Sequence, residues 1–188
     1  MSVAFDLNSL RLRLTPHLSP SNSSDAAIAI IIDTSQASIL LIKRVEREGD
    51  PWSGQIAFPG GHKSQSDPTL LETAIRETKE EVGIELEPRH LLGLLPSLPA
   101  RTRRVEVTPF VFHLTSQPGL NANFEVAEAF WASLADLMKI HPRKSGVEMN
   151  GRRLTVDSYL YHGHIIWGLT FRTLNLLLNR RQNPNSDR

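Results

Sequence analysis

The chain has 188 residues, of which 40% are hydrophobic, and is therefore long enough to bury the core of one globular domain. Its formal net charge is +1, so no overall field would attract nucleic acid or a membrane surface, and we expect neither as a partner. The absence of cysteine excludes disulfides, thiolate metal sites and cysteine nucleophiles, and it fits a reducing, cytoplasmic setting.

The N-terminal part of the chain is predicted to form one short helix and two strands. Residues 5–14 have helical spacing, and the polar segment SPSNSSD (19–25) ends that helix. Apolar, β-branched runs at 26–32 and 38–42 predict two strands separated by DTSQ. No run reaches the ~18 apolar residues of a membrane span, and MSVAFDLNSLRLRL lacks a signal-peptide pattern. These features also predict a cytoplasmic protein.

The clearest predicted helix covers residues 68–82. Asp67 is the expected N-cap, Pro68 suits the first turn, and Gly83 suits the left-handed position after the last turn. One side of this helix is expected to anchor it to a sheet. The residues on that side are Leu71, Ala74, Ile75, Thr78 and Val82.

The remaining elements mix strands and helices. Strands are expected at 91–98, 105–114, 127–131, 152–160 and 164–167, with helices at 134–138 and 169–179. We expect one domain over residues 1–188, in which about 1–24 form the N-terminal helix and polar loop and about 181–188 form a polar tail. Because the regular alternation of a doubly wound fold is missing, we predict a mixed sheet with flanking helices.

Three glutamates gather near the end of the helix at 68–82. Glu77, Glu80 and Glu81 fall within one arc, because positions three and four apart are neighbours on a helix. Like charges at these spacings cost a few tenths of a kcal/mol per pair, and the helix C-terminus disfavours anions. Arg76 can pair with Glu80. A solvated charged face is the plainer interpretation, whereas a bound divalent cation would make the arrangement favourable.

The doubled glycine before this helix favours the cation. Gly60 and Gly61 permit a tight turn whose main-chain carbonyls can face a metal. Ligation by oxygen atoms alone suits Mg²⁺ or Mn²⁺ rather than Zn²⁺. The sequence therefore predicts a site for Mg²⁺ or Mn²⁺ between the glycines and the helix.

The segment 61–84 resembles the Nudix box, which reads Gly, five residues, Glu, seven residues, then Arg-Glu-aliphatic-x-Glu-Glu-x-Gly-aliphatic. The matching residues are Gly61, Arg76, Glu77, Glu80, Glu81, Gly83 and Ile84. The early acid is Asp67 rather than Glu, eight residues rather than seven separate it from Arg76, and Thr78 replaces an aliphatic residue. The resemblance implies an α/β (α+β) fold, an α/β/α sandwich with a mixed β-sheet. It also implies hydrolysis of a nucleoside diphosphate linked to another moiety.

The same resemblance implies roles for the matched residues. Glu77 and Glu81 would be the principal metal ligands, and Glu80 a further ligand or a base that positions water. The carbonyl of Gly60 would complete a coordination sphere, and Arg76 would orient the carboxylates. The cluster would then hold divalent ions against a diphosphate.

A further acid in this family often comes from a later loop. Glu125, in FEVAEAFWASL, is the first candidate and Glu128 the second. The alternative interpretation of Glu125 is a charge at a strand edge.

Three other segments resemble the coenzyme A pyrophosphatase branch: LLIKR (40–44), GQIAFPGG (54–61) and IWGLTFR (166–172). Asp50 stands where that branch usually has arginine, and Val45 replaces a small residue. This resemblance implies cleavage of coenzyme A or its derivatives to 3′-phosphoadenosine 5′-phosphate and 4′-phosphopantetheine. The alternatives are NADH, ADP-ribose or a nucleoside triphosphate as substrate, or a nucleotide-sensing module without turnover.

A substrate with a diphosphate and a 3′-phosphate should recruit positive charge, for which guanidinium is the natural bidentate partner. Besides Gly61, the candidate substrate-binding residues are Lys43, Arg44, Arg47, Arg101, Arg103 and Arg104. For Arg44 and the RTRR cluster, a solvated surface is the alternative. His162 and His164 have the spacing of one strand face and are expected to be structural. A homodimer is compatible with the sequence.

Overall fold

The computed structural model describes residues 7–11, 14, 24–48, 52–100, 105–149 and 151–180. The predicted loop before residue 24, Asp50, the basic segment 101–104 and the tail at 181–188 lie outside these ranges. In chain order the elements are α1 (Leu7–Arg11), β1 (Ser24–Asp33), β2 (Ser38–Arg44), β3 (Ile56–Ala57), β4 (Gly60–His62), α2 (Leu70–Val82), the 3₁₀ turn η1 (Pro88–His90), β5 (Leu91–Leu94), β6 (Leu98–Ala100), β7 (Val105–Leu114), β8 (Val126–Ser133), α3 (Leu134–Lys139), β9 (Arg143–Met149), β10 (Arg152–Tyr161), β11 (His164–Trp167) and α4 (Gly168–Leu177).

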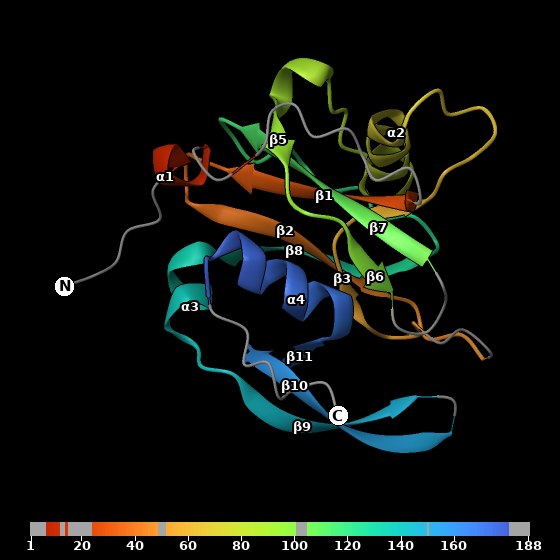
Figure 1. The fold of residues 1–188 in the computed structure, drawn as a ribbon, viewed down its shortest axis with the longest axis vertical. Helices are drawn as coiled ribbons and strands as arrows, with labels where there is room; N and C mark the ends of the chain where they lie inside the picture. The colour runs from red at the N-terminus through yellow and green to blue at the C-terminus, as the bar shows by residue number, and fades with distance from the viewer. Residues whose placement is uncertain are drawn as a thin grey trace.

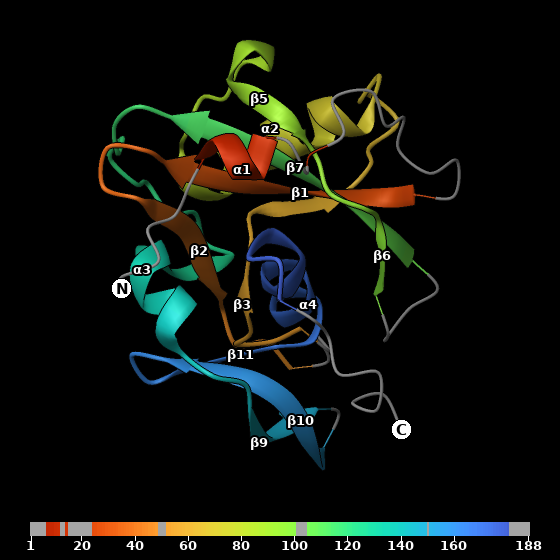
Figure 2. The ribbon, with the colours of Figure 1, turned by 60° about the vertical axis from the view of Figure 1, so that its left-hand side comes forward.

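The main sheet is mixed, as predicted. Its central path runs β3-β2-β1-β7-β5, and β4, β6 and β8 pair with β1, β7 and β2 respectively. The long strands β1 and β7 are parallel, whereas β1 and β2 are antiparallel. Helix α2 lies on one side of β1 and α4 on the other (Figures 1 and 2), which gives the layered α/β arrangement.

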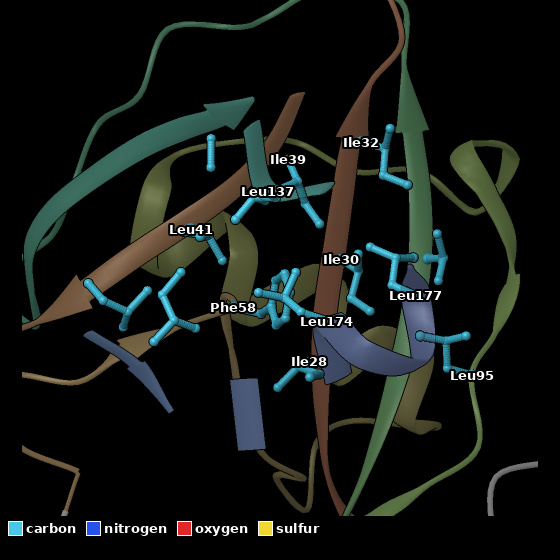
Figure 3. Packing of buried hydrophobic residues seen from close by; sticks show 14 of the residues in the cluster. Ile28, Ile30, Ile32, Ile39, Leu41, Phe58, Leu95, Leu137, Leu174 and Leu177 are labelled. Carbon is cyan, nitrogen blue, oxygen red and sulfur yellow. The ribbon is translucent and has the colours of Figure 1, made fainter. Parts of the chain in front are cut away.

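Strand β1 explains why both faces of this sheet are covered. Its sequence SDAAIAIIID has almost no polar residue in the middle, which is typical of a strand buried on both sides. Ala27, Ala29 and Ile31 pack on the α2 side. Ile28, Ile30 and Ile32 pack on the other side, where α4 contributes Leu174 and Leu177 (Figure 3). No helix in the described residues is long and apolar enough to cross a membrane.

A second sheet, in the order β11-β10-β9, packs against α4 on the side away from α2. Strand β9 was not predicted, because its sequence RKSGVEM has no apolar alternation and most of its side chains are exposed. The prediction that His162 and His164 share a strand face was wrong. Tyr161 pairs with His164 across a two-residue turn, in which His162 and Gly163 have φ values of 45° and 87°.

The prediction of a single strand at 91–98 is also wrong, because this segment forms two shorter strands, β5 and β6, that both pair with β7. Leu94 of β5 lies opposite Phe110, and Leu98 of β6 lies opposite Val107. Pro96 stands between them, and proline has no N–H to donate to a continuous ladder.

Helix α2 ends as predicted and begins later than predicted. Gly83 has φ 73° and donates its N–H to the carbonyl of Lys79. The N-cap is Thr69 rather than Asp67, and Pro68 precedes the helix. The hydroxyl of Thr69 accepts the N–H groups of Leu71 and Glu72 at 3.2 and 3.4 Å. Asp67 is buried and is used elsewhere.

Replacing Thr69 with alanine tests this N-cap. We expect T69A to lower the free energy of unfolding by about 1 kcal/mol, because two N–H groups of the first turn lose their acceptor. T69S keeps the hydroxyl and should stay within a few tenths of a kcal/mol of the wild type. Chemical denaturation measures both, and equal stability of the two variants would contradict the assignment.

Candidate active site

Two glycines bring strand β4 close to the last turns of α2. At Gly60, a Cβ atom would lie 2.2 Å from the carbonyl oxygen of Ala27, and the φ value of 148° disfavours any other residue. At Gly61, a Cβ atom would lie 2.6 Å from the Cδ of Glu77. Gly61 therefore leaves the space that the carboxylate of Glu77 occupies, while Gly60 allows β4 to lie close against β1.

Glu81 is the most deeply buried acid of the site. Its side chain is 3% exposed, and its Oε2 accepts the N–H of Gly60 at 2.9 Å. The pKa of Glu81 is raised to about 7, chiefly by burial and also by the charges of Glu77 and Glu125, while the hydrogen bond from Gly60 and the charge of Arg44 oppose the rise. Near neutral pH this group is therefore poised between its two protonation states.

Glu77 and Glu80 lie on the same side of α2 in different environments. The side chain of Glu77 is 18% exposed, and burial raises its pKa, with the charge of Glu80 acting in the same direction. The side chain of Glu80 is 55% exposed and accepts a hydrogen bond from Arg76 at 3.0 Å, as predicted from the i, i+4 spacing. Glu80 is thus the most solvent-exposed of the three glutamates.

Arg76 holds these acids together. Its Nη1 lies 2.8 Å from Oε1 of Glu77 and also donates to Glu80. Its Nε and Nη2 donate to the two carboxylate oxygens of Asp67, both at 2.9 Å. This bidentate pair lowers the pKa of Asp67, and Asp67 raises the pKa of Arg76. Arg76 therefore stays charged and fixed in orientation.

Asp67 is the contributor that sequence reasoning missed. Its position before the helix predicts an N-cap, whereas it anchors Arg76 and accepts hydrogen bonds from Ser64 N and Thr73 Oγ1 at 2.9 and 3.0 Å. Helical spacing could not reveal this pair, because Asp67 lies in the loop before α2. The sequence signal that could have indicated this role is the position of Asp67 as the early acid of the Nudix box.

The two later acids lie on opposite faces of the main sheet. Glu125 precedes β8, and its charge contributes to the raised pKa of Glu81. Glu128 shares the face of β8 that carries Phe130, and its Oε2 lies 3.7 Å from Nε2 of His164. The structure thus places Glu125, and not Glu128, beside the α2 glutamates.

Two of the predicted basic residues also reach these acids. Nη1 of Arg44, at the end of β2, lies 3.8 Å from Oε1 of Glu81. Nη1 of Arg47 lies 3.5 Å from Oε1 of Glu125. Lys43 points to the other face of β2 and lines a cavity there. Arg101, Arg103 and Arg104 lie outside the described residues, so their assignment remains a prediction.

The side chains present fit a divalent metal in chemical type. Among the residues that the structure describes, no three acidic or imidazole side chains already converge as a metal site. Arg76 supplies the positive charge for Glu77 and Glu80, whereas the cation nearest to buried Glu81 in the described part of the chain is Arg44, at 3.8 Å. A hard cation, for which carboxylate oxygens are the preferred ligands, would offset the cost of burying a charged Glu81 and its repulsion from Glu77.

The family follows from comparison with known proteins. The family model described as NUDIX domain matches residues 23–149, which include the glycine strand and the whole of α2. The chain belongs to the Nudix family. Hydrolases of this family generally use a divalent metal ion, which agrees with the carboxylate oxygens gathered at this site.

Two relatives extend the match over nearly the whole chain. An uncharacterized Nudix hydrolase, NudL, from Pectobacterium atrosepticum is 33% identical over 183 residues, covering 93% of this chain and 94% of that protein. The NudL protein of Photorhabdus laumondii is 32% identical over 187 residues, covering 97% and 99%. The chain is therefore a Nudix hydrolase, a pyrophosphohydrolase that acts on nucleoside diphosphate derivatives.

A solved structure confirms the fold. A MutT/nudix family protein from Enterococcus faecalis superposes with a TM-score of 0.56 at 18% identity, covering 85% of this chain and 63% of that one. The Nudix sandwich with its mixed sheet, predicted from the box, is thus the observed architecture.

Replacing Glu81 with glutamine tests its electrostatic state. A raised folded-state pKa means that protonation stabilises the fold below pH 4.5, the ordinary value, and that this stabilisation is lost as pH rises through about 7. Glutamine is neutral and can still accept the N–H of Gly60. At pH 8 without divalent metal, we expect E81Q to be more stable than the wild type by on the order of 1–2 kcal/mol.

Thermal unfolding from pH 5 to pH 8 measures the difference, which should shrink toward pH 5. Glu85 provides the control, because its side chain is 75% exposed and pairs with Lys79 at 2.8 Å. E85Q should give no gain at any pH. A gain of E81Q that does not depend on pH would contradict the assigned charge state.

Proposed function

We propose that this Nudix hydrolase cleaves the diphosphate of coenzyme A or its derivatives, with Mg²⁺ or Mn²⁺, to 3′-phosphoadenosine 5′-phosphate and 4′-phosphopantetheine. Glu77, Glu80, Glu81 and Arg76 would form the catalytic centre, assisted by Glu125. We further expect the protein to act in the cytoplasm as one domain, alone or as a homodimer.

One observation carries the choice of substrate. The three segments that resemble the coenzyme A branch are far apart in the sequence, yet all of them line one cavity of about 760 Å³. LLIKR contributes Lys43, GQIAFPGG contributes its first three residues, and IWGLTFR contributes Trp167. The hydroxyl of Thr170 donates to the carbonyl of Ile56 at 2.8 Å and joins the last two segments. The shared cavity supports a common role of the three segments in binding the substrate.

The cavity has the position and lining to take the part of the substrate beyond the diphosphate. None of the three α2 glutamates lines it, but Arg47 does, and Arg47 also contacts Glu125. Met149 and Trp167 supply apolar walls, Lys43 and Arg47 supply positive charge, and Glu46 and Glu148 supply negative charge. A long, mostly uncharged chain next to phosphates matches this combination.

The reaction would use the side chains as the structure arranges them. When bound, the metal would neutralise the diphosphate oxygens and acidify a water molecule. Glu77 and Glu81 would hold it, with the Gly60 carbonyl as a further ligand. Exposed Glu80 would position the attacking water or accept its proton. Arg76, fixed by Asp67, would keep the carboxylates in place.

The alternatives differ in what they require of the site. Hydrolysis of NADH, ADP-ribose or a nucleoside triphosphate would use the same carboxylates. It would not explain why the three segments that resemble the coenzyme A branch line one cavity. A nucleotide-sensing module would need no turnover and would not require the arrangement of Arg76 with the three glutamates. We therefore favour the coenzyme A pyrophosphatase over both.

A substrate panel tests the proposal. We expect the protein, supplied with Mg²⁺ or Mn²⁺, to hydrolyse coenzyme A or an acyl derivative in preference to NADH, ADP-ribose and nucleoside triphosphates, and to require the metal. Mass spectrometry should identify 4′-phosphopantetheine and 3′-phosphoadenosine 5′-phosphate. Comparing the turnover of dephospho-coenzyme A with that of coenzyme A shows whether the enzyme recognises the 3′-phosphate. A clear preference for another member of the panel would refute the proposed substrate.

Variants of the helix test the mechanism. E77Q and E80Q should each lower kcat by at least about 100-fold, because each removes a metal ligand or a proton acceptor. E85Q is the matched control and should retain activity, since Glu85 is an exposed glutamate just beyond α2. Unchanged activity of E80Q would exclude its proposed role, and unchanged activity of both variants would refute the mechanism.

A further inference from the structure

We infer that Phe124 is a stacking platform for the nucleoside base of the substrate. Its side chain is 77% exposed, and Leu160, at 41%, is the other large hydrophobic side chain exposed in the described part of the chain. A phenylalanine ring that stays in water contributes no burial free energy to folding. Contact with a ligand would bury it, which gives the exposed position a functional explanation. The inference rests on the proposed function only in requiring that the substrate carry a base.

Phe124 lies at the edge of the catalytic centre. It immediately precedes Glu125, the acid whose charge acts on Glu81. The N–H of Asn123 donates to the carbonyl of Glu81 at 3.0 Å, and the N–H of Val45 donates to the carbonyl of Glu125 at 2.9 Å. The backbone around Phe124 is thus tied on one side to α2 and on the other to the residue that follows β2.

Arg47 fixes the ring relative to the site. Its Cζ lies 5.3 Å from the centre of the Phe124 ring, in a cation–π contact. Its Nη2 also donates to the carbonyl of Phe124 at 3.3 Å, while Nη1 faces Glu125. One guanidinium therefore holds the ring, the acid and the rim of the cavity together.

This arrangement suits a flat, uncharged π-system. The guanidinium occupies one side of the ring, and the high exposure of Phe124 leaves further ring surface open to solvent. A purine base can stack on such a surface, and stacking does not depend on which base is present. The ring would then bind the nucleoside half of the substrate, while the cavity beyond Arg47 takes the other half.

Direct binding tests the inference on the full-length protein. With Mg²⁺ present, calorimetry would compare AMP with ribose 5-phosphate, which has the phosphate and sugar but no base. We expect F124A to raise the Kd for AMP about tenfold and to leave the Kd for ribose 5-phosphate within twofold. F124W keeps an aromatic face and should retain the affinity for AMP. For an adenine-containing substrate, the loss in F124A should appear in KM rather than in kcat.

L160A is the matched control, because it removes an exposed hydrophobic side chain on β10 and should change neither affinity. Equal binding of AMP by F124A and the wild type would overturn the inference. Equal weakening of both ligands in F124A would also overturn it, since that points to a general change of the site. If coenzyme A is not cleaved but AMP binding depends on Phe124 as described, the proposed substrate fails while this inference stands.

Discussion

The close contact between the glycine strand and helix α2 is the constraint on which the site depends. Gly60 donates its N–H to Glu81, and Gly61 leaves room for the carboxylate of Glu77. A side chain at Gly61 would collide with Glu77 and push the helix away from β4, whereas one at Gly60 would collide with β1 at Ala27 and Ile28. Because α2 is anchored to the main sheet by Ala74 and Val82, that displacement would also disturb the core on this face. The geometry of the candidate active site and the packing of the core are therefore linked at this contact.

Arg76 makes the concentration of acids tolerable. Asp67 orients one edge of its guanidinium, and the opposite edge neutralises Glu77 and Glu80. Glu81 is left with weaker compensation, and its raised pKa is the sign of that imbalance. A fold selected for stability alone would not bury this carboxylate. Its retention is consistent with an exchange of stability for the binding of a cation, which is common at catalytic sites.

Much of the architecture and of the glutamate arc could be predicted from periodicity. The spacing of Glu77, Glu80 and Glu81 places them on one helix face, and Gly83 ends that helix. Contacts between a loop and a helix have no such period, so the pairing of Asp67 with Arg76 could not be found in that way. Strand β9 escaped prediction because it is held by pairing with β10, and its exposed side chains carry no hydrophobic pattern.

The second sheet lies on the face of the main sheet opposite α2, and its strands β9 and β11 form much of the cavity wall. Residues such as Val147 and Met149 can therefore be exchanged without moving a single carboxylate of α2. Under the proposed function, this separation allows related enzymes to differ in the leaving group that they bind. The carboxylates that carry out the hydrolysis can stay the same. Evolution could thus broaden or narrow the range of molecules processed through mutations that are neutral for the chemical step.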